Sequence, residues 1–191
     1  MVKIICEGKS DKKLITNFID FLGYEGCYSD DNFIVMGNKS NIFKDDDPRY
    51  KTLIQLIDTD KISKIVFIVD ADYEADNNTY GGYDNTKKEI EAFITKLKLE
   101  KISEYFISCD PTTKDGYLES LLLSTVDENL KSCYSEFLDC VDFKEKSQHK
   151  YIMEQLHRIT SPNKPYDFSH QNFDELRMKL EKLFIGNTHR P

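Results

Sequence analysis

The sequence predicts an α/β protein built on a mainly parallel, four-stranded sheet with helices on both faces. Short runs of β-branched and aromatic residues alternate with stretches in which apolar residues recur at helical spacing, over about two thirds of the chain. A strand–helix–strand order of this kind is typical of parallel sheets. The run Ile65–Val69 is apolar throughout, as expected for a strand buried on both faces.

The first part of the chain predicts two strands and two helices before that central strand. Ser10 is a suitable N-cap for the first helix, and Gly23 a suitable terminator. Pro48 opens the second helix, because proline is tolerated in the first helical turn. The segments are a strand at 2–6, a helix at 11–22, a strand at 33–36 and a helix at 48–57.

The central strand begins at Lys64 and is followed by a loop, a helix and one more strand. The loop, 73–84, is rich in Asn, Asp, Gly and Tyr. The helix is indicated by four apolar residues at helical spacing between 90 and 97, and the strand by Tyr105-Phe106-Ile107.

Beyond Cys109 the pattern is helical only. A helix begins near Tyr117, and Thr125 with Glu128 forms a capping-box pattern ahead of the next one. Further helices are expected around 152–159, ended by Ser161-Pro162, and 173–184, with Gly186 as terminator. We therefore predict an α/β domain at 1–125 and an all-helical extension at 126–191 packed on it.

The composition and charge of the chain exclude some classes of protein. The chain has 191 residues, 39% of them hydrophobic, so it can bury a core. A net charge of −8 argues against coating nucleic acid by bulk electrostatics, but not against a nucleic-acid enzyme whose acidic site binds metal. Apolar runs are far shorter than a membrane span, and no signal-peptide layout is found, so we expect no membrane partner. Five cysteines at irregular spacing are typical of reduced thiols and a cytoplasmic location.

Acidic residues follow two of the predicted strands. Asp70 and Asp72 come after the central strand, and Glu7 after the first. In an open α/β sheet, binding and catalytic sites lie outside the carboxyl ends of the strands. If the two strands are neighbours, these carboxylates would lie close together. Asp11, four residues after Glu7, could face the same way. Hard oxygen ligands favour Mg²⁺ or Mn²⁺ over zinc. Alternatively, these acids only stabilise a helix N-terminus and solvate a strand end.

Other motifs are incomplete. Gly8-Lys9-Ser10 resembles the end of a Walker A loop, but the earlier glycine would fall at Lys3, inside a strand. The stretch 70–81 lacks the central glycine and closing glutamate of a calcium loop. A phosphoacceptor receiver domain would require two acidic residues where this chain has Cys6-Glu7. The spacing of Cys133, Cys140, His149 and His157 does not match a zinc site.

Two motifs together resemble the TOPRIM family. A strand ending in Glu-Gly-Lys-Ser-Asp (7–11) is followed by a hydrophobic strand ending in Asp-Ala-Asp (70–72). The resemblance covers about residues 1–125. The segments 37–41 (Gly-Asn-Lys-Ser-Asn) and 116–119 (Gly-Tyr-Leu-Glu) are similar to those of small stand-alone TOPRIM-like proteins, relatives of the overcoming-lysogenization-defect (OLD) nucleases.

The resemblance implies a Rossmann-like TOPRIM sheet and specific residue roles. Glu7 would be the general acid/base or a metal ligand, and Asp70 and Asp72 would hold Mg²⁺. Asp11 would help to bind a second metal ion, as the corresponding acid does in OLD-like members. Glu119 would add a carboxylate, the alternative being an exposed acid on a leucine-rich helix.

The function expected from these motifs is Mg²⁺-dependent phosphoryl transfer, by a nuclease acting on DNA or RNA. Lys9 and Lys39 would contact phosphates, unless they belong to an ordinary solvated surface. An alternative is a non-catalytic TOPRIM-like subunit or regulator of a larger nucleic-acid-processing or defence complex, with an ATPase or a second copy as partner. A small-molecule phosphatase or nucleotidyl transferase using the same residues is a third hypothesis.

Overall fold

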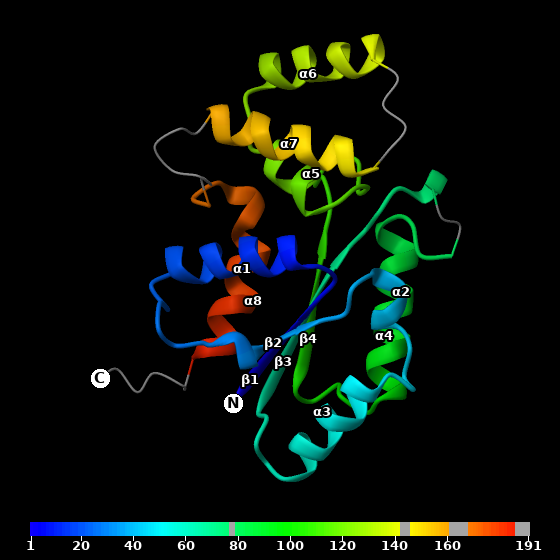
Figure 1. The fold of residues 1–191 in the computed structure, drawn as a ribbon, viewed down its shortest axis with the longest axis vertical. Coiled ribbons are helices and arrows are strands. Elements are labelled where there is room, and N and C mark those ends of the chain that lie inside the picture. Colours follow the sequence, from blue (N-terminus) through cyan, green and yellow to red (C-terminus); the bar gives the residue numbers. More distant parts are fainter. Residues whose placement is uncertain (77–78, 142–145, 161–167, 186–191) are drawn as a thin grey trace. The chain divides into compact units, whose positions relative to one another are not determined.

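The computed structural model describes residues 1–76, 79–141, 146–160 and 168–185. Its centre is a four-stranded sheet in the order β2-β1-β3-β4 (Figure 1). The strands are β1 (Val2–Cys6), β2 (Phe33–Val35), β3 (Lys64–Asp70) and β4 (Ser103–Ser108). The predicted α/β class and the predicted four strands are therefore confirmed.

All four strands run in parallel. β1 pairs with β2 in the register Cys6↔Val35 and with β3 in the register Cys6↔Ile68. Between β3 and β4 the amide of Ile65 donates to the Ile102 carbonyl, and the amide of Ala71 to the Ser108 carbonyl, both at 2.8 Å. Partners advance in the same direction on both strands, as parallel pairing requires. β1 is buried along its whole length and β3 beyond Lys64, which explains their continuous apolar sequences.

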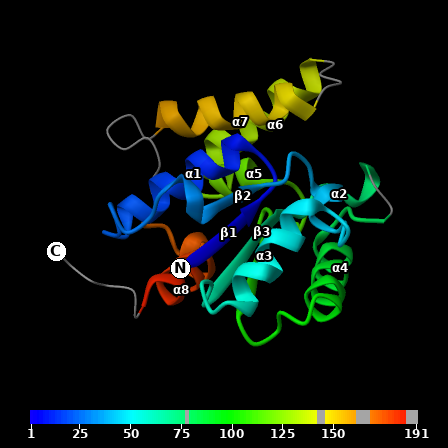
Figure 2. The ribbon, with the colours of Figure 1, turned by 60° about the horizontal axis from the view of Figure 1, so that its bottom comes forward.

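Helices cover both faces of the sheet (Figures 1 and 2). One face carries α1 (Lys9–Phe21) and α8 (Asp174–Phe184), and Tyr24, which follows α1, stacks on Phe184 of α8. The other face carries α3 (Pro48–Asp58) and α4 (Tyr83–Lys96), with the four-residue α2 (Lys39–Ile42) before them. Phe93 of α4 forms edge contacts with Tyr50 of α3 and Phe67 of β3, so one aromatic side chain joins both helices to the sheet.

Contacts divide the chain into two compact units. The first comprises 1–70, 84–107 and the segment from Asp174 on; the second comprises 71–83 and 108–173. The second contains η2 (Glu74–Asp76), α5 (Leu118–Leu123), α6 (Glu128–Cys140), α7 (Lys146–Thr160) and η3 (Gln171–Phe173), with α5 packed against α7. The predicted division into an α/β domain at 1–125 and a helical extension at 126–191 packed on it stays a prediction.

Several predicted helix ends need correction. The N-cap of α1 is Gly8 and not Ser10, and the N-cap of α6 is Asp127 and not Thr125. α4 begins at Tyr83, inside the predicted loop. The first two turns of this helix are polar, which is why the sequence pattern indicated a loop there. Gly23 follows the C-cap of α1 with φ +83°, so its predicted role is confirmed. The predicted terminators Ser161-Pro162 and Gly186 lie outside the described residues.

In the described part of the chain, no helix combines the length and the apolar composition that crossing a membrane requires.

Candidate functional site

Glu7 and Asp70 lie at the carboxyl ends of the two central strands. Glu7 directly follows β1, and Asp70 is the last residue of β3. The parallel register places Cys6 opposite Ile68, so β1 and β3 end at the same edge of the sheet. The Glu7 side chain crosses to the next strand, where its Oε1 accepts a hydrogen bond from the amide of Asp70 at 3.1 Å.

This pair flanks the point where the strand order reverses. From β1 the chain moves to β2 on one side, and then returns to β3 on the other side of β1 before continuing to β4. Connections on the two sides diverge at such a point, and ligands of open α/β sheets bind there, outside the carboxyl ends of the strands. The strand order therefore indicates a binding site at the same strand ends at which the sequence has its carboxylates.

The surroundings of this strand end are buried and acidic. Asp70 is only 3% exposed, whereas Glu7 is half-buried. The pKa of the neighbouring Cys6 thiol is raised to about 12, first by burial and then by the negative charge of Asp11, with smaller contributions from Glu7 and Asp70. Three carboxylates thus act on one sulfur atom, and the thiol stays protonated at neutral pH. Sequence reasoning gave Cys6 no role, because a cysteine inside an apolar strand has no distinctive pattern.

Asp11 is engaged in capping a helix. It is the third residue of α1, is buried, and its Oδ2 accepts a hydrogen bond from the amide of Gly8 at 2.7 Å. Gly8 has no side chain to return the contact, so Asp11 provides half of a capping box. Asp11 therefore stabilises the N-terminus of α1, as one of the two interpretations of the sequence predicts. Metal binding by Asp11 would use the same carboxylate.

The two predicted phosphate contacts differ in environment. Lys9, in the first turn of α1, is exposed. Lys39, the first residue of α2, is buried, and its Nζ donates to Thr86 Oγ1 on α4 at 2.8 Å. Burying an ammonium group is costly unless polar partners surround it, so Lys39 is not part of an ordinary solvated surface. Thr86 could not be found from sequence, since a polar residue in a polar helical turn carries no signal.

Asp72 belongs to the second unit and has an unusual backbone. Its φ is +60°, in the left-handed region that non-glycine residues seldom adopt. Its amide donates to the Gly116 carbonyl at 2.7 Å, and the Gly116 amide donates back to the Asp72 carbonyl at 3.0 Å. Aspartate adopts this region more readily than most residues, and the two backbone hydrogen bonds to Gly116 hold it there.

Glu119, also in the second unit, is buried on α5, so the alternative of an exposed acid is wrong. Its Oε2 lies 3.4 Å from Nζ of Lys150 on α7, and the same ammonium group lies 4.6 Å from the ring centre of Tyr117. A buried carboxylate is stable when such a cation compensates its charge. Lys150 was missed in the sequence because nothing local links it to Glu119.

The carboxylates of the site can be compared with the ligand number and ligand type that a metal ion requires. Among the described residues, no group of three or more His, Cys, Asp or Glu side chains is placed to hold a metal ion. Mg²⁺ commonly takes only one or two protein carboxylates and completes its octahedron with water and substrate phosphates. Glu7 and Asp70 are two hard oxygen donors, so their chemistry fits Mg²⁺ or Mn²⁺ and not a closed zinc site. Cys133 and Cys140 are exposed, and the His149 and His157 side chains lie outside the described residues.

Comparison with known proteins found no protein-family model, no curated protein and no solved structure that matches this chain.

Proposed function

We propose that the chain is a Mg²⁺-dependent phosphoryl-transfer enzyme of the TOPRIM type, acting as a nuclease on DNA or RNA phosphodiesters. The observation that carries the proposal is the Glu7–Asp70 pair at the reversal point of a parallel sheet. The spacing of the acids along the chain supports the proposal too, because Asp72 follows Asp70 by only two residues.

The roles follow from the environment of each group. Glu7, half-buried at the end of β1, is the group we assign to accept the proton of an attacking water and to return it to the leaving oxygen. Asp70, at the end of β3, would hold the metal. The resemblance to TOPRIM proteins implies Asp72 as a second ligand, and Asp11 and Glu119 are further carboxylates that rest on this resemblance alone. A bound Mg²⁺ would neutralise phosphate oxygens and lower the pKa of a bound water. Lys39 and Lys9 would contribute positive charge to a polyanionic substrate.

The test is a cleavage assay on plasmid DNA, single-stranded DNA and RNA with Mg²⁺ or Mn²⁺. Glu7→Gln and Asp70→Asn keep the size of each side chain, and each is expected to lower the rate by at least about a hundredfold. Asp58→Asn, at an exposed position near the end of α3, is the matched control and should keep wild-type activity. Cleavage that survives both site variants would refute the proposed roles. Isothermal titration with Mn²⁺ measures metal binding separately.

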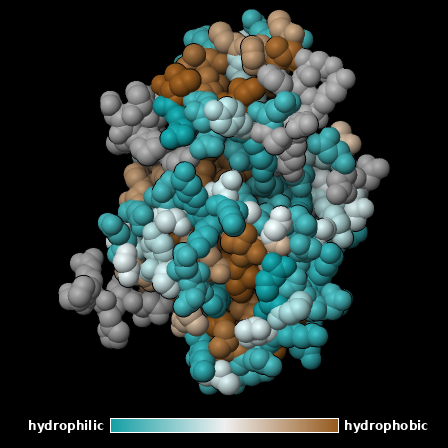
Figure 3. Space-filling view, viewed as in Figure 1, coloured by the Kyte–Doolittle hydropathy of each residue, from teal (hydrophilic) through white to brown (hydrophobic). Residues whose placement is uncertain are grey.

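A second candidate function is that of a non-catalytic subunit, favoured by the surface of α6 and α7. Apolar side chains gather over these helices (Figure 3). Leu130 and Phe137 on α6 are 39% and 46% exposed, and Tyr151 and Ile159 on α7 are 63% and 73% exposed. Among the residues of α6, only Tyr134 is buried, although the helix has a regular apolar stripe. An exposed apolar stripe is typical of a protein-binding surface.

The acidic residues of α6 favour a partner with a basic rim around an apolar centre; they include Glu128, Glu136 and Asp139. Pull-down from native extract with wild-type protein and Phe137→Asp tests this function. A stoichiometric partner captured only by the wild type, together with no cleavage of any substrate, would replace the nuclease proposal.

A further inference from the structure

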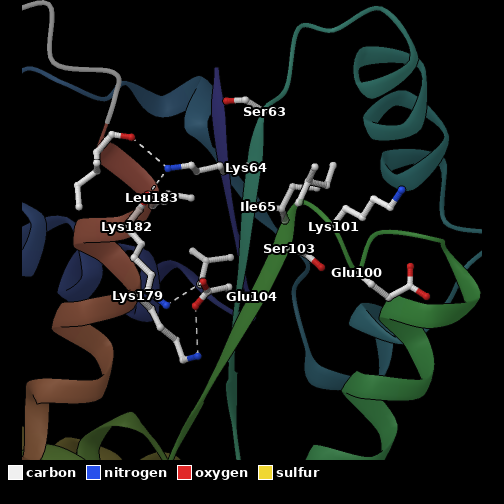
Figure 4. A pocket seen from close by; sticks show the side chains of 13 residues that line it. Ser63, Lys64, Ile65, Glu100, Lys101, Ser103, Glu104, Lys179, Lys182 and Leu183 are labelled. Carbon is white, nitrogen blue, oxygen red and sulfur yellow. Dashed lines mark hydrogen bonds and ion pairs between the residues drawn. The ribbon is translucent and has the colours of Figure 1, made fainter.

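A cavity of about 500 Å³ opens in the first unit at the edge of the sheet where the strands begin (Figure 4). It is lined by the start of β3, the loop before β4 and the first residues of β4, and the last turns of α8. Asp70 lies at the opposite end of β3, about 17 Å from Ile65 by the rise per residue of a strand. A ligand in this cavity therefore occupies a place separate from the proposed metal site.

The charge of the cavity is opposite to that of the chain. Four lysines line it against two glutamates, whereas the whole chain has a net charge of −8. The lining charges are Lys64, Lys101, Lys179, Lys182, Glu100 and Glu104. A concave surface with excess positive charge concentrates anions, even on an acidic protein.

The two lysines of α8 share one carboxylate of the cavity wall. Glu104 on β4 lies 3.4 Å from Nζ of Lys179 and 3.3 Å from Nζ of Lys182, as Figure 4 shows. These distances exceed the roughly 2.7–2.9 Å of tight charge-assisted hydrogen bonds. Glu175, outside the cavity, lies 3.9 Å from Lys179. Lys64 instead donates to the carbonyls of Lys182 and Ile185, which fixes the end of α8 beside the cavity.

The remaining wall is apolar. Ile65 of β3, Ile102 before β4 and Leu183 of α8 line the cavity together with the charged groups. Small-molecule sites commonly have this volume and this combination of apolar walls with a few convergent polar groups. We propose that the cavity binds a small organic anion, whose phosphate or carboxylate group takes the place of the Glu104 carboxylate beside Lys179 and Lys182 and whose body lies against the apolar wall.

The proposal is tested by isothermal titration of the full chain with four probes. AMP carries a phosphate on a flat body, octanoate carries a carboxylate on an alkyl chain, adenosine has a body without charge, and inorganic phosphate has charge without a body. AMP or octanoate should bind saturably, at least about tenfold more tightly than adenosine or phosphate. The stronger of the two shows whether the natural ligand is a phosphate or a carboxylate.

Paired variants show where the ligand binds. Lys179→Gln with Lys182→Gln should weaken binding at least about tenfold, because both partners of the anion lose their charge. Lys87→Gln with Lys88→Gln, two exposed positions of α4 outside the cavity, makes the same change in net charge and should leave the affinity within about twofold.

Glu104→Gln gives a result that loss of folding cannot imitate. It removes the carboxylate shared by Lys179 and Lys182, so the affinity should rise several-fold. Absence of saturable binding to both organic anions would overturn the proposal. It would also be overturned by equal losses in the two lysine pairs, or by weaker binding in a folded Glu104→Gln protein. None of these outcomes depends on nuclease activity.

Discussion

Asp72 and Gly116 form a constrained backbone pairing in the second unit. Asp72 is left-handed at φ +60°, Gly116 has φ +100°, and two backbone hydrogen bonds join them. A Cβ atom added at Gly116 would lie 2.3 Å from Ser120 Oγ, which itself accepts the amide hydrogen of Tyr117 at the start of α5. The position of Asp72 thus depends on a residue without a side chain.

Gly116→Ala is therefore expected to lower the free energy of unfolding by about 2–4 kcal/mol, combining a left-handed Cβ penalty with a steric clash. Gly26→Ala is the matched control, since Gly26 also has positive φ but no atom within 4 Å of an added Cβ. It should cost only about 1 kcal/mol. Urea unfolding measures both, and equal losses would show that the clash with Ser120 is relieved at no cost.

Cys6 provides a prediction about pH. Its thiol pKa is raised from 9.0 to about 12 in the folded protein, mainly by burial and next by Asp11. The unfolded thiol would ionise near pH 9, whereas the folded one keeps its proton. The stability from Cys6 is thus complete below pH 9 and is lost as the pH rises toward 12.

The loss of stability between pH 8 and pH 10.5 should consequently be smaller in Cys6→Ala than in the wild type, because alanine has no proton to lose. Thiol titration of the folded protein at pH 8 supplies an independent measurement. The exposed Cys27, Cys133 and Cys140 should react quickly and Cys6 only on unfolding. Fast reaction of Cys6, or identical pH slopes, would contradict this account.

At the scale of elements, Asp11 of helix α1 has two possible roles, which are to cap the helix N-terminus and to bind a metal ion. The hydrogen bond from Gly8 to Asp11 satisfies an amide at the helix N-terminus. Asp11→Ala should cost about 1 kcal/mol of unfolding free energy, while Asp11→Asn keeps an acceptor oxygen and should cost less than about half of that. Thermal and urea unfolding provide the comparison.

Asp11→Asn also separates the two roles. If Asp11 is a metal ligand, Mn²⁺ affinity falls in this variant although stability is retained, because an amide oxygen lacks the negative charge. Unchanged Mn²⁺ affinity would leave Asp11 with capping alone.

The sequence predicted strands better than helix ends. β1 and β3 are buried along almost their whole length, so their apolar runs were unambiguous. The start of α4 was missed because Thr86 is the one buried side chain between Tyr83 and Glu89. The sequence favours Ser10 as the N-cap of α1, since side-chain identity does not show that Asp11 reaches back to the amide of Gly8.

The candidate site was predictable only where it is local in sequence. Glu7 and Asp70 each follow a recognisable strand, and a parallel sheet brings strand ends together. The contacts of Lys39 with Thr86 and of Glu119 with Lys150 join residues 47 and 31 positions apart. Such pairs depend on how helices pack, which the spacing of residues along one helix does not reveal.

At the scale of the whole molecule, α8 completes the first unit although it is the last helix of the described chain. Leu176, Leu180, Leu183 and Phe184 are all buried, and the helix packs on β3. A fragment of residues 1–125, the predicted α/β domain, lacks this cover and would expose the apolar face of β3.

We expect this fragment to lose cooperative unfolding and to bind the dye ANS, as collapsed states with exposed apolar surface do. The full chain serves as control, and circular dichroism with calorimetry follows both proteins. A fragment that unfolds in a single sharp transition would establish 1–125 as an independent domain.

The path of the chain through the two units also has a consequence for synthesis on the ribosome. Lys64 at the start of β3 contacts the carbonyl of Lys182, 118 positions later. Domains usually fold from the N-terminus as they emerge, at roughly 5–20 residues per second. Here the sheet can form early, but the part of it that α8 covers stays exposed for several more seconds of translation. During that interval the nascent chain is a natural substrate for chaperones that bind apolar surface.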